Sequence, residues 1–213
     1  MKCDKKNMLL YAVTDRAWTK EKTLYEQVED ALKGGITCLQ LREKNLSKEE
    51  IRKEALKIGP LSKKYGVPFI INDDVEIALK CGADGVHVGQ DDMEAGKVRA
   101  IAGDNLIIGV SAHSVEEALK AEAAGADYLG VGAMFSTSTK TNVRPMTKEI
   151  LRDICNAVSI PVVAIGGIGK GNIGSLHGTG ASGVAVVSAI FAAKDIEAEC
   201  KILRKLSEEM VNS

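Results

Sequence analysis

Short β-rich runs alternate with longer amphipathic, charged stretches along the whole of the 213-residue chain. This alternation predicts βα units around a parallel sheet, because each parallel strand needs a crossover segment before the next strand can pair with it. Eight runs have the length and residue types of buried strands, and they cover residues 9–14, 38–42, 69–72, 85–88, 107–111, 128–133, 162–165 and 183–187. Eight evenly distributed units favour a closed (β/α)8 barrel, with a doubly wound open sheet as the alternative.

Helical patterns lie between these runs. Residues 23–35, 47–59, 114–125 and 147–158 each begin with Ser or Thr as N-cap and place apolar residues three and four positions apart. A last amphipathic stretch, residues 195–213, has no strand after it, and we expect it to close the ring as the eighth helix.

Composition agrees with strands that are buried on both faces. Hydrophobic residues make up 45% of the chain and aromatic residues only 4%, so the core must consist mainly of Val, Ile, Leu and Ala. No proline-rich linker or low-complexity segment divides the sequence. We therefore predict an α/β fold, a single-domain TIM barrel that spans residues 1–213.

Charge and cysteine usage narrow the class of partner. A formal net charge of -1 gives no broad field for nucleic acid or anionic membranes, which favours small-molecule substrates. The apolar run near the start is too short for a signal peptide core and no long apolar stretch follows, so we expect a cytoplasmic protein.

The five cysteines are scattered and form no C-x-x-C pair, which argues against disulfides and a zinc site. The sequence does not decide whether copies of the chain form a homo-oligomer.

The second predicted strand ends in the segment QLREK. Side-chain alternation sends Gln40, Arg42 and Lys44 to one side and Leu41 and Glu43 to the other. An amide, a guanidinium and an ammonium at a barrel mouth suit a polyanion. The alternative is a solvated strand end with ordinary salt bridges.

Carboxylates follow the third and fourth predicted strands. Because neighbouring parallel strands lie about 4.8 Å apart, Asp73 and Asp92 can reach one ion between them. Two carboxylates with open positions suit Mg²⁺, which completes its shell with water and substrate phosphate oxygens. Asp74 and Asp91 are interpreted instead as helix N-caps.

The three histidines lack the spacing of a metal site. His87 lies inside the fourth strand, where a packed and hydrogen-bonded residue is expected. His113 lies just beyond Ser111 at the predicted rim, where an acid or base role is one interpretation. Ser111 itself is either a site residue or a helix cap.

Glycine and hydroxyl residues follow the last three strands. Residues 134–142 form a polar loop in which hydroxyls and turn amides could hold a phosphate while Lys140 reaches a second anion, although ordinary loops have the same composition. Gly166, Gly167 and Ser188 lie where the seventh and eighth loops of these barrels commonly bind phosphate. The segment GGIGKG is not a P-loop, which disfavours hydrolysis of nucleoside triphosphates.

Eight segments, in chain order, resemble the motifs of the thiamine phosphate synthase family. They are YAVTD, QLREK, ND, HVGQDD, GVSAH, TSTK, AIGGI and VVSAI, and they span nearly the whole chain. The resemblance implies a transferase that joins 4-amino-2-methyl-5-hydroxymethylpyrimidine diphosphate to hydroxyethylthiazole phosphate, giving thiamine phosphate and diphosphate. In that family the diphosphate leaves first, and the thiazole nitrogen captures the pyrimidine-methyl cation.

The resemblance also implies roles for individual residues. The pyrimidine diphosphate site would contain Gln40, Leu41, Arg42, Glu43, Lys44, Asn72, Ser111 and Lys140. The thiazole phosphate site would contain Thr137, Ser138, Thr139, Gly167, Val187 and Ser188. The catalytic residues would be Arg42, Lys44, Ser111 and Lys140, and Asp73 and Asp92 would bind Mg²⁺. Family members usually carry Pro before the TxTK segment where this chain has Ser136, and the loss of a fixed φ angle predicts a looser loop there.

Two other functions fit a barrel of this kind. A thiazole tautomerase-like relative would share the phosphate site but would have little use for the two aspartates or the full QLREK cluster. A non-catalytic barrel that senses phosphorylated metabolites would not need the complete set of metal and basic ligands.

Overall fold

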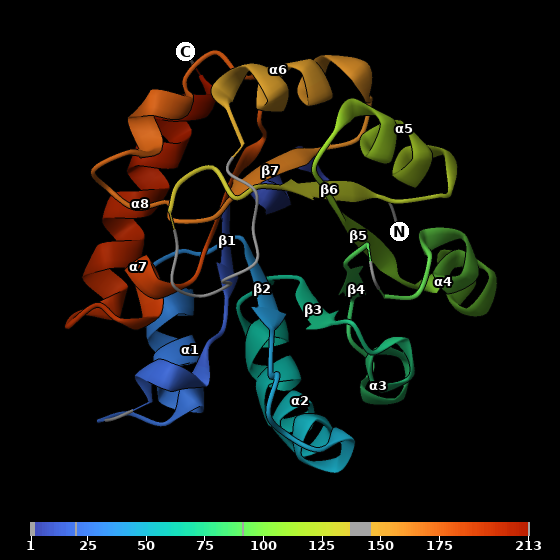
Figure 1. The fold of residues 1–213 in the computed structure, drawn as a ribbon. Helices are drawn as coiled ribbons and strands as arrows, with labels where there is room; N and C mark the ends of the chain where they lie inside the picture. The colour runs from blue at the N-terminus through green and yellow to red at the C-terminus, as the bar shows by residue number, and fades with distance from the viewer. Residues whose placement is uncertain (1–2, 20, 91, 137–145, 213) are drawn as a thin grey trace.

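The computed structural model describes residues 3–19, 21–90, 92–136 and 146–212. Eight parallel strands form a closed barrel in chain order, and β8 pairs back onto β1 (Figure 1). The strands are β1 (Leu10–Val13), β2 (Cys38–Leu41), β3 (Phe69–Asn72), β4 (Gly85–Val88), β5 (Ile107–Ala112), β6 (Tyr128–Val131), β7 (Val162–Ile165) and β8 (Gly183–Val186). The predicted (β/α)8 barrel is confirmed, and each predicted strand ends within two residues of the observed one.

Helices surround the barrel, as Figure 1 shows. They are α1 (Leu24–Lys33), α2 (Lys48–Lys64), α3 (Val75–Cys81), α4 (Ala95–Ala102), α5 (Val115–Ala123), α6 (Lys148–Ala157), α7 (Ser188–Phe191) and α8 (Ile196–Val211). Short 3-10 turns are η1 (Lys5–Met8), η2 (Arg16–Trp18), η3 (Gly103–Asn105) and η4 (Ile173–Leu176). Between β7 and β8 the described chain has η4 in place of an α-helix.

Two of the predicted helix starts are complete capping boxes. Thr23 caps α1 together with Glu26, and Ser47 caps α2 together with Glu50. Each pair satisfies two backbone N–H groups that the first turn of a helix leaves without partners. Helix α2 continues beyond the predicted pattern, through Pro60 to Lys64, because buried Leu61 packs beneath its last turns.

Apolar residues form two clusters, one on each side of the strands. The larger cluster fills the space between the barrel wall and the helices. The smaller one lies inside the barrel and consists of Met8, Tyr11, Val13, Cys38, Ile70, Ile107, Tyr128, Val163 and Ala185. Strands that are buried on both faces explain why the chain needs so many aliphatic residues.

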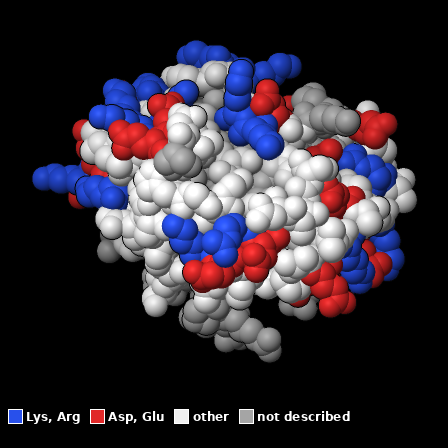
Figure 2. Space-filling view, turned by 90° about the horizontal axis from the view of Figure 1, so that it is seen from above, with Lys and Arg blue, Asp and Glu red and all other residues white. Residues whose placement is uncertain are grey.

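The surface carries charges of both signs. On the face shown in Figure 2, Lys and Arg side chains adjoin Asp and Glu side chains around an uncharged central area. Within the described residues, no helix combines the length and hydropathy that crossing a bilayer requires.

Candidate active site at the carboxyl ends of the strands

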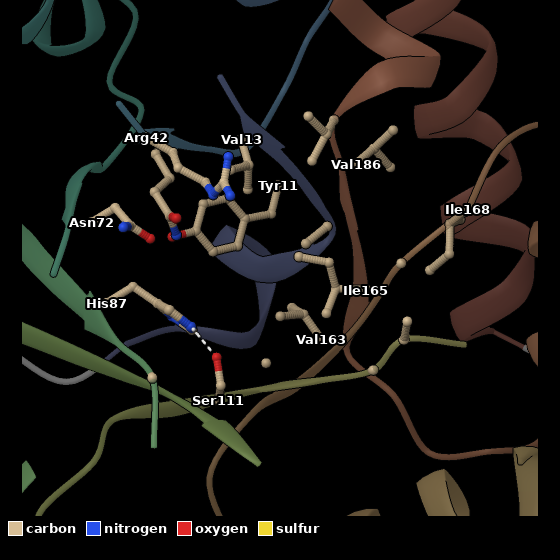
Figure 3. Close-up of a pocket in the computed structure, with 18 of the residues that line it drawn as sticks. Tyr11, Val13, Arg42, Asn72, His87, Ser111, Val163, Ile165, Ile168 and Val186 are labelled. Carbon is tan, nitrogen blue, oxygen red and sulfur yellow. Dashed lines mark hydrogen bonds between the residues drawn. The ribbon is translucent and has the colours of Figure 1, made fainter. Parts of the chain in front are cut away.

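A cavity opens at the carboxyl ends of the barrel strands and encloses about 1180 Å³ of space, part of it open to solvent. Figure 3 shows polar side chains on one side of it and apolar side chains on the other. The polar side contains Arg42, Asn72, His87 and Ser111, and the apolar side contains Val163, Ile165, Ile168 and Val186. In barrels of this kind the working residues lie at this end of the strands.

The QLREK segment divides as alternation predicts. Gln40, Arg42 and Lys44 all line the cavity. Leu41 packs in the cluster between strands and helices, and the nearly buried Glu43 side chain forms an ion pair with Arg16 at 3.2 Å. Neither Leu41 nor Glu43 is among the described residues that line the cavity, so their place in the pyrimidine diphosphate site stays a prediction.

Asp73 lies at the edge of the cavity directly after β3. Its Oδ2 accepts hydrogen bonds from Lys44 Nζ at 2.6 Å and from Asn72 Nδ2 at 2.5 Å. Burial raises the pKa of this carboxyl, and the nearby Asp92 carboxyl raises it further, whereas Lys44 acts in the opposite direction. Its backbone has φ +65°, a conformation that residues other than glycine seldom adopt. The surrounding fold therefore holds Asp73 in a costly conformation.

Asp92 lies beside Asp73 and also lines the cavity. Its Oδ2 accepts the Gly89 backbone N–H at 2.7 Å, which fixes the turn after β4. Asp74 turns away, because its carboxylate caps α3 at the Ile77 N–H. The interpretation of Asp74 as an N-cap is thus confirmed, and Asp91 lies outside the described residues.

The two neighbouring carboxylates fit a hard divalent cation. Mg²⁺ commonly takes one or two protein carboxylates and fills its other positions with water and phosphate oxygens. Among the described residues no group of three or more His, Cys, Asp or Glu side chains gathers as a metal cluster. Asp73 and Asp92 would therefore fill only a few coordination positions of the cation and leave the others to water and ligand oxygens.

A chain of hydrogen bonds crosses the floor of the cavity. Gln40 Nε2 donates to the Tyr11 hydroxyl at 2.7 Å, and this hydroxyl lies 2.8 Å from that of Tyr128. The Tyr128 hydroxyl lies 3.0 Å from His87 Nδ1. His87 Nε2 lies 3.0 Å from Ser111 Oγ, the contact drawn in Figure 3. Burial raises the pKa of both tyrosines well above the ordinary value, so both hydroxyls keep their protons.

Sequence reasoning missed Tyr11 and Tyr128, the two tyrosines of this hydrogen-bonded series, and placed His87 in the core. His87 is indeed hydrogen-bonded, but it is only half-buried and lines the cavity. One available signal was Gly109, which pairs with Tyr128 across β5 and β6 and leaves room for the tyrosine ring. The register between β5 and β6 had to be known before that signal could be used.

The opposite wall is built by the loops after β7 and β8. Gly166 and Gly167, with φ values of 102° and 63°, line the cavity together with Val187 and Ser188. A Cβ atom at Gly167 would lie 2.9 Å from Phe135 Cβ, so only glycine lets the two loops pack this closely. The predicted residues Thr137, Ser138, Thr139 and Lys140 lie outside the described residues.

His113 also faces the cavity. Its backbone N–H donates to Glu117 Oε2 at 2.7 Å, and its Nδ1 lies 3.1 Å from the same oxygen. Glu117 thus orients the imidazole at the rim. The acid or base role of His113 stays a prediction.

A closed (β/α)8 barrel whose mouth gathers cationic, acidic and glycine-lined segments defines a TIM-barrel enzyme. Comparison with known proteins then identifies the family. A family profile described as thiamine monophosphate synthase matches residues 10–190. The chain belongs to the thiamine monophosphate synthase family and is a transferase, as the resemblance in the motifs indicated.

Individual relatives agree with this assignment. Thiamine-phosphate synthase from Ruminiclostridium cellulolyticum is 52% identical over 203 residues, which cover 95% of each chain. The protein of the same name from Clostridium acetobutylicum is 48% identical over 194 residues, covering 91% of this chain and 92% of the relative. The solved structure of thiamine phosphate pyrophosphorylase from Pyrococcus furiosus is 42% identical with a TM-score of 0.89, covering 97% of this chain and 98% of the other. These likenesses support thiamine-phosphate synthase function.

Proposed function

We propose that the chain condenses 4-amino-2-methyl-5-hydroxymethylpyrimidine diphosphate with hydroxyethylthiazole phosphate to form thiamine phosphate and diphosphate. The observation that carries the proposal is the gathering of Arg42, Lys44, Asp73 and Asp92 on one side of the cavity, opposite the glycine-lined loops. Two anion-binding regions at one mouth suit two phosphorylated small-molecule substrates.

The basic residues would act on the leaving group. As the bond between the pyrimidine methylene carbon and the diphosphate oxygen breaks, its electron pair moves to the diphosphate. The Arg42 guanidinium and the Lys44 ammonium would stabilise the charge that develops there, and Lys140 is expected to join them. Magnesium held by Asp73 and Asp92 would supply further positive charge to the same group.

The glycine loops would position the second substrate. Backbone amides near Gly167 and Ser188 would bind the thiazole phosphate and hold the ring nitrogen against the methylene carbon. The nitrogen lone pair then forms the new C–N bond. No protein nucleophile and no net proton transfer is required, so the residues have only to bind, orient and stabilise charge.

The test supplies both substrates and Mg²⁺ to the purified chain and measures thiamine phosphate and diphosphate. We expect both products in equal amounts, and none after EDTA removes the magnesium. Lys44→Met should lower kcat/KM by about 100-fold, the usual scale for removing one charge-stabilising donor. Lys48→Met is the matched control, since this lysine is 74% exposed and pairs with Asp74 outside the cavity. A folded wild-type protein that forms neither product would refute the proposal.

A further inference from the structure

We propose that Glu43 and Arg16 are positioning residues, which lie outside the cavity and hold Arg42 and Lys44 so that they face it. Neither Glu43 nor Arg16 is among the described residues that line the cavity. The inference rests on the proposed function, because Arg42 and Lys44 are the described cations that this function assigns to the leaving diphosphate. It gives a role to the charged residue of the QLREK segment that faces away from the cavity.

The segment of residues 42–44 lies beyond the paired part of β2. Pairing of β2 ends at Gln40 on the β1 side and at Leu41 on the β3 side. Within a strand, the pleated and hydrogen-bonded backbone fixes the direction in which successive side chains project. Past the last paired residues, other contacts must decide which side chains face the cavity.

Side chains of the loop after β1 supply such contacts. Thr14 is fully buried, and its Oγ1 accepts the Arg42 backbone N–H at 2.9 Å. Arg16 Nε lies 3.2 Å from each carboxylate oxygen of Glu43. One loop therefore holds two successive residues of the segment where the β1–β2 ladder has ended. With Glu43 held on the outside, its neighbours Arg42 and Lys44 line the cavity, as Figure 3 shows for Arg42.

The ion pair of Glu43 and Arg16 is well placed to fix one orientation. The Glu43 side chain is 4% exposed, whereas that of Arg16 is 40% exposed. Burial raises the pKa of the Glu43 carboxyl, and the hydrogen bond from Arg16 acts in the opposite direction. Arg16 Nη2 also lies 3.4 Å from Glu54 Oε2, so the same guanidinium connects the segment to α2. Because a nearly buried carboxylate is costly without a partner, Glu43 strongly favours the orientation that keeps this pair.

Positioning and simple charge effects predict opposite results when Glu43 is removed. Its carboxylate is negative and lies in sequence between two cations of the proposed anion site. By Coulomb's law alone, removal of this charge should strengthen the binding of an anion. If Glu43 holds the two cations in place, removal should weaken binding, because displaced cations lose their hydrogen bonds to the ligand. The sign of the change therefore separates the two explanations.

The experiment uses Glu43→Ala, Glu43→Gln and Arg16→Met. Glu49→Ala and Arg52→Met are the matched controls, because these two residues form an exposed ion pair on α2, also at 3.2 Å. Circular dichroism and thermal melts check that each variant folds. Calorimetry measures the binding of inorganic diphosphate in the presence of Mg²⁺, and steady-state kinetics measures the KM of each substrate.

We expect Glu43→Ala to lower the affinity for diphosphate by about 10- to 100-fold, the scale on which a small displacement affects a site. Arg16→Met should lower it by a similar factor. Glu43→Gln should lose less, because the amide oxygen still accepts a hydrogen bond from Arg16. The KM for the pyrimidine diphosphate should rise in the same order, and the KM for the thiazole phosphate should stay unchanged. Both controls should behave as the wild type.

Unchanged or tighter diphosphate binding in a folded Glu43→Ala protein would overturn the inference. An equal rise in KM for both substrates would also overturn it, because that result indicates general loosening of the barrel. If Glu43→Ala does not fold, the other two variants decide, and wild-type affinity in both rejects the positioning role. If the wild type binds diphosphate but forms no product, the proposed function fails separately, and the binding series still tests Glu43 and Arg16.

Discussion

Gly109 on β5 provides a direct test of how the floor of the cavity is packed. An ideal Cβ at this position would lie 2.5 Å from His87 Nδ1 and closer still to the ring and hydroxyl of Tyr128. Real Cβ atoms essentially never approach other heavy atoms within 3.0 Å, so Gly109→Ala must displace at least one of the two rings. Overpacking of this kind costs about 1–3 kcal/mol of unfolding free energy. For a chain of this size we expect the melting temperature to fall by about 2–12 °C.

The control is Gly96→Ala in α4, where the new Cβ would lie 4.0 Å from the Ala124 Cβ. There the better helix propensity of alanine should raise stability by up to about 1 kcal/mol. Adding Tyr128→Leu to Gly109→Ala removes the clashing ring atoms, so the cost of the alanine should shrink in the double variant. Thermal melts of the wild type, Gly96→Ala, Gly109→Ala, Tyr128→Leu and the double variant measure this. A Gly109→Ala protein as stable as the wild type, with an unchanged KM for the pyrimidine substrate, would refute the reasoning.

Two further changes test the metal site and a helix cap. Mg²⁺ at 100 times its dissociation constant should stabilise the wild type by about 2.7 kcal/mol. Asp92→Asn should lose that stabilisation while keeping an acceptor for the Gly89 N–H, and an equal magnesium-induced rise in melting temperature would place the ion elsewhere. Ser47→Ala should cost about 1 kcal/mol in a denaturant titration, because it removes the N-cap of α2. Glu50→Gln should cost less, since glutamine also completes a capping box, and equal losses would contradict this account.

Much of the barrel could be predicted from local patterns. The count of strands, the capped starts of α1 and α2, and the side of β2 from which Gln40, Arg42 and Lys44 project all depend on neighbours in sequence. The roles of the adjacent residues Asp73 and Asp74 could also be distinguished, because Asp74 is followed directly by a helix that needs an N-cap. The identity of the family followed from motifs placed at successive strand ends.

Other features required the closed sheet. Tyr11 and Tyr128 are 117 residues apart in the sequence. Their side chains meet only because the sheet closes into a barrel and both project into its interior. The positive φ of Asp73 and its position beside Asp92 come from the turns that follow β3 and β4, which no local pattern indicates. Periodicity determines which way a side chain faces along its own strand. Which distant side chain it then meets is decided by strand register and packing, and these are properties of the folded barrel.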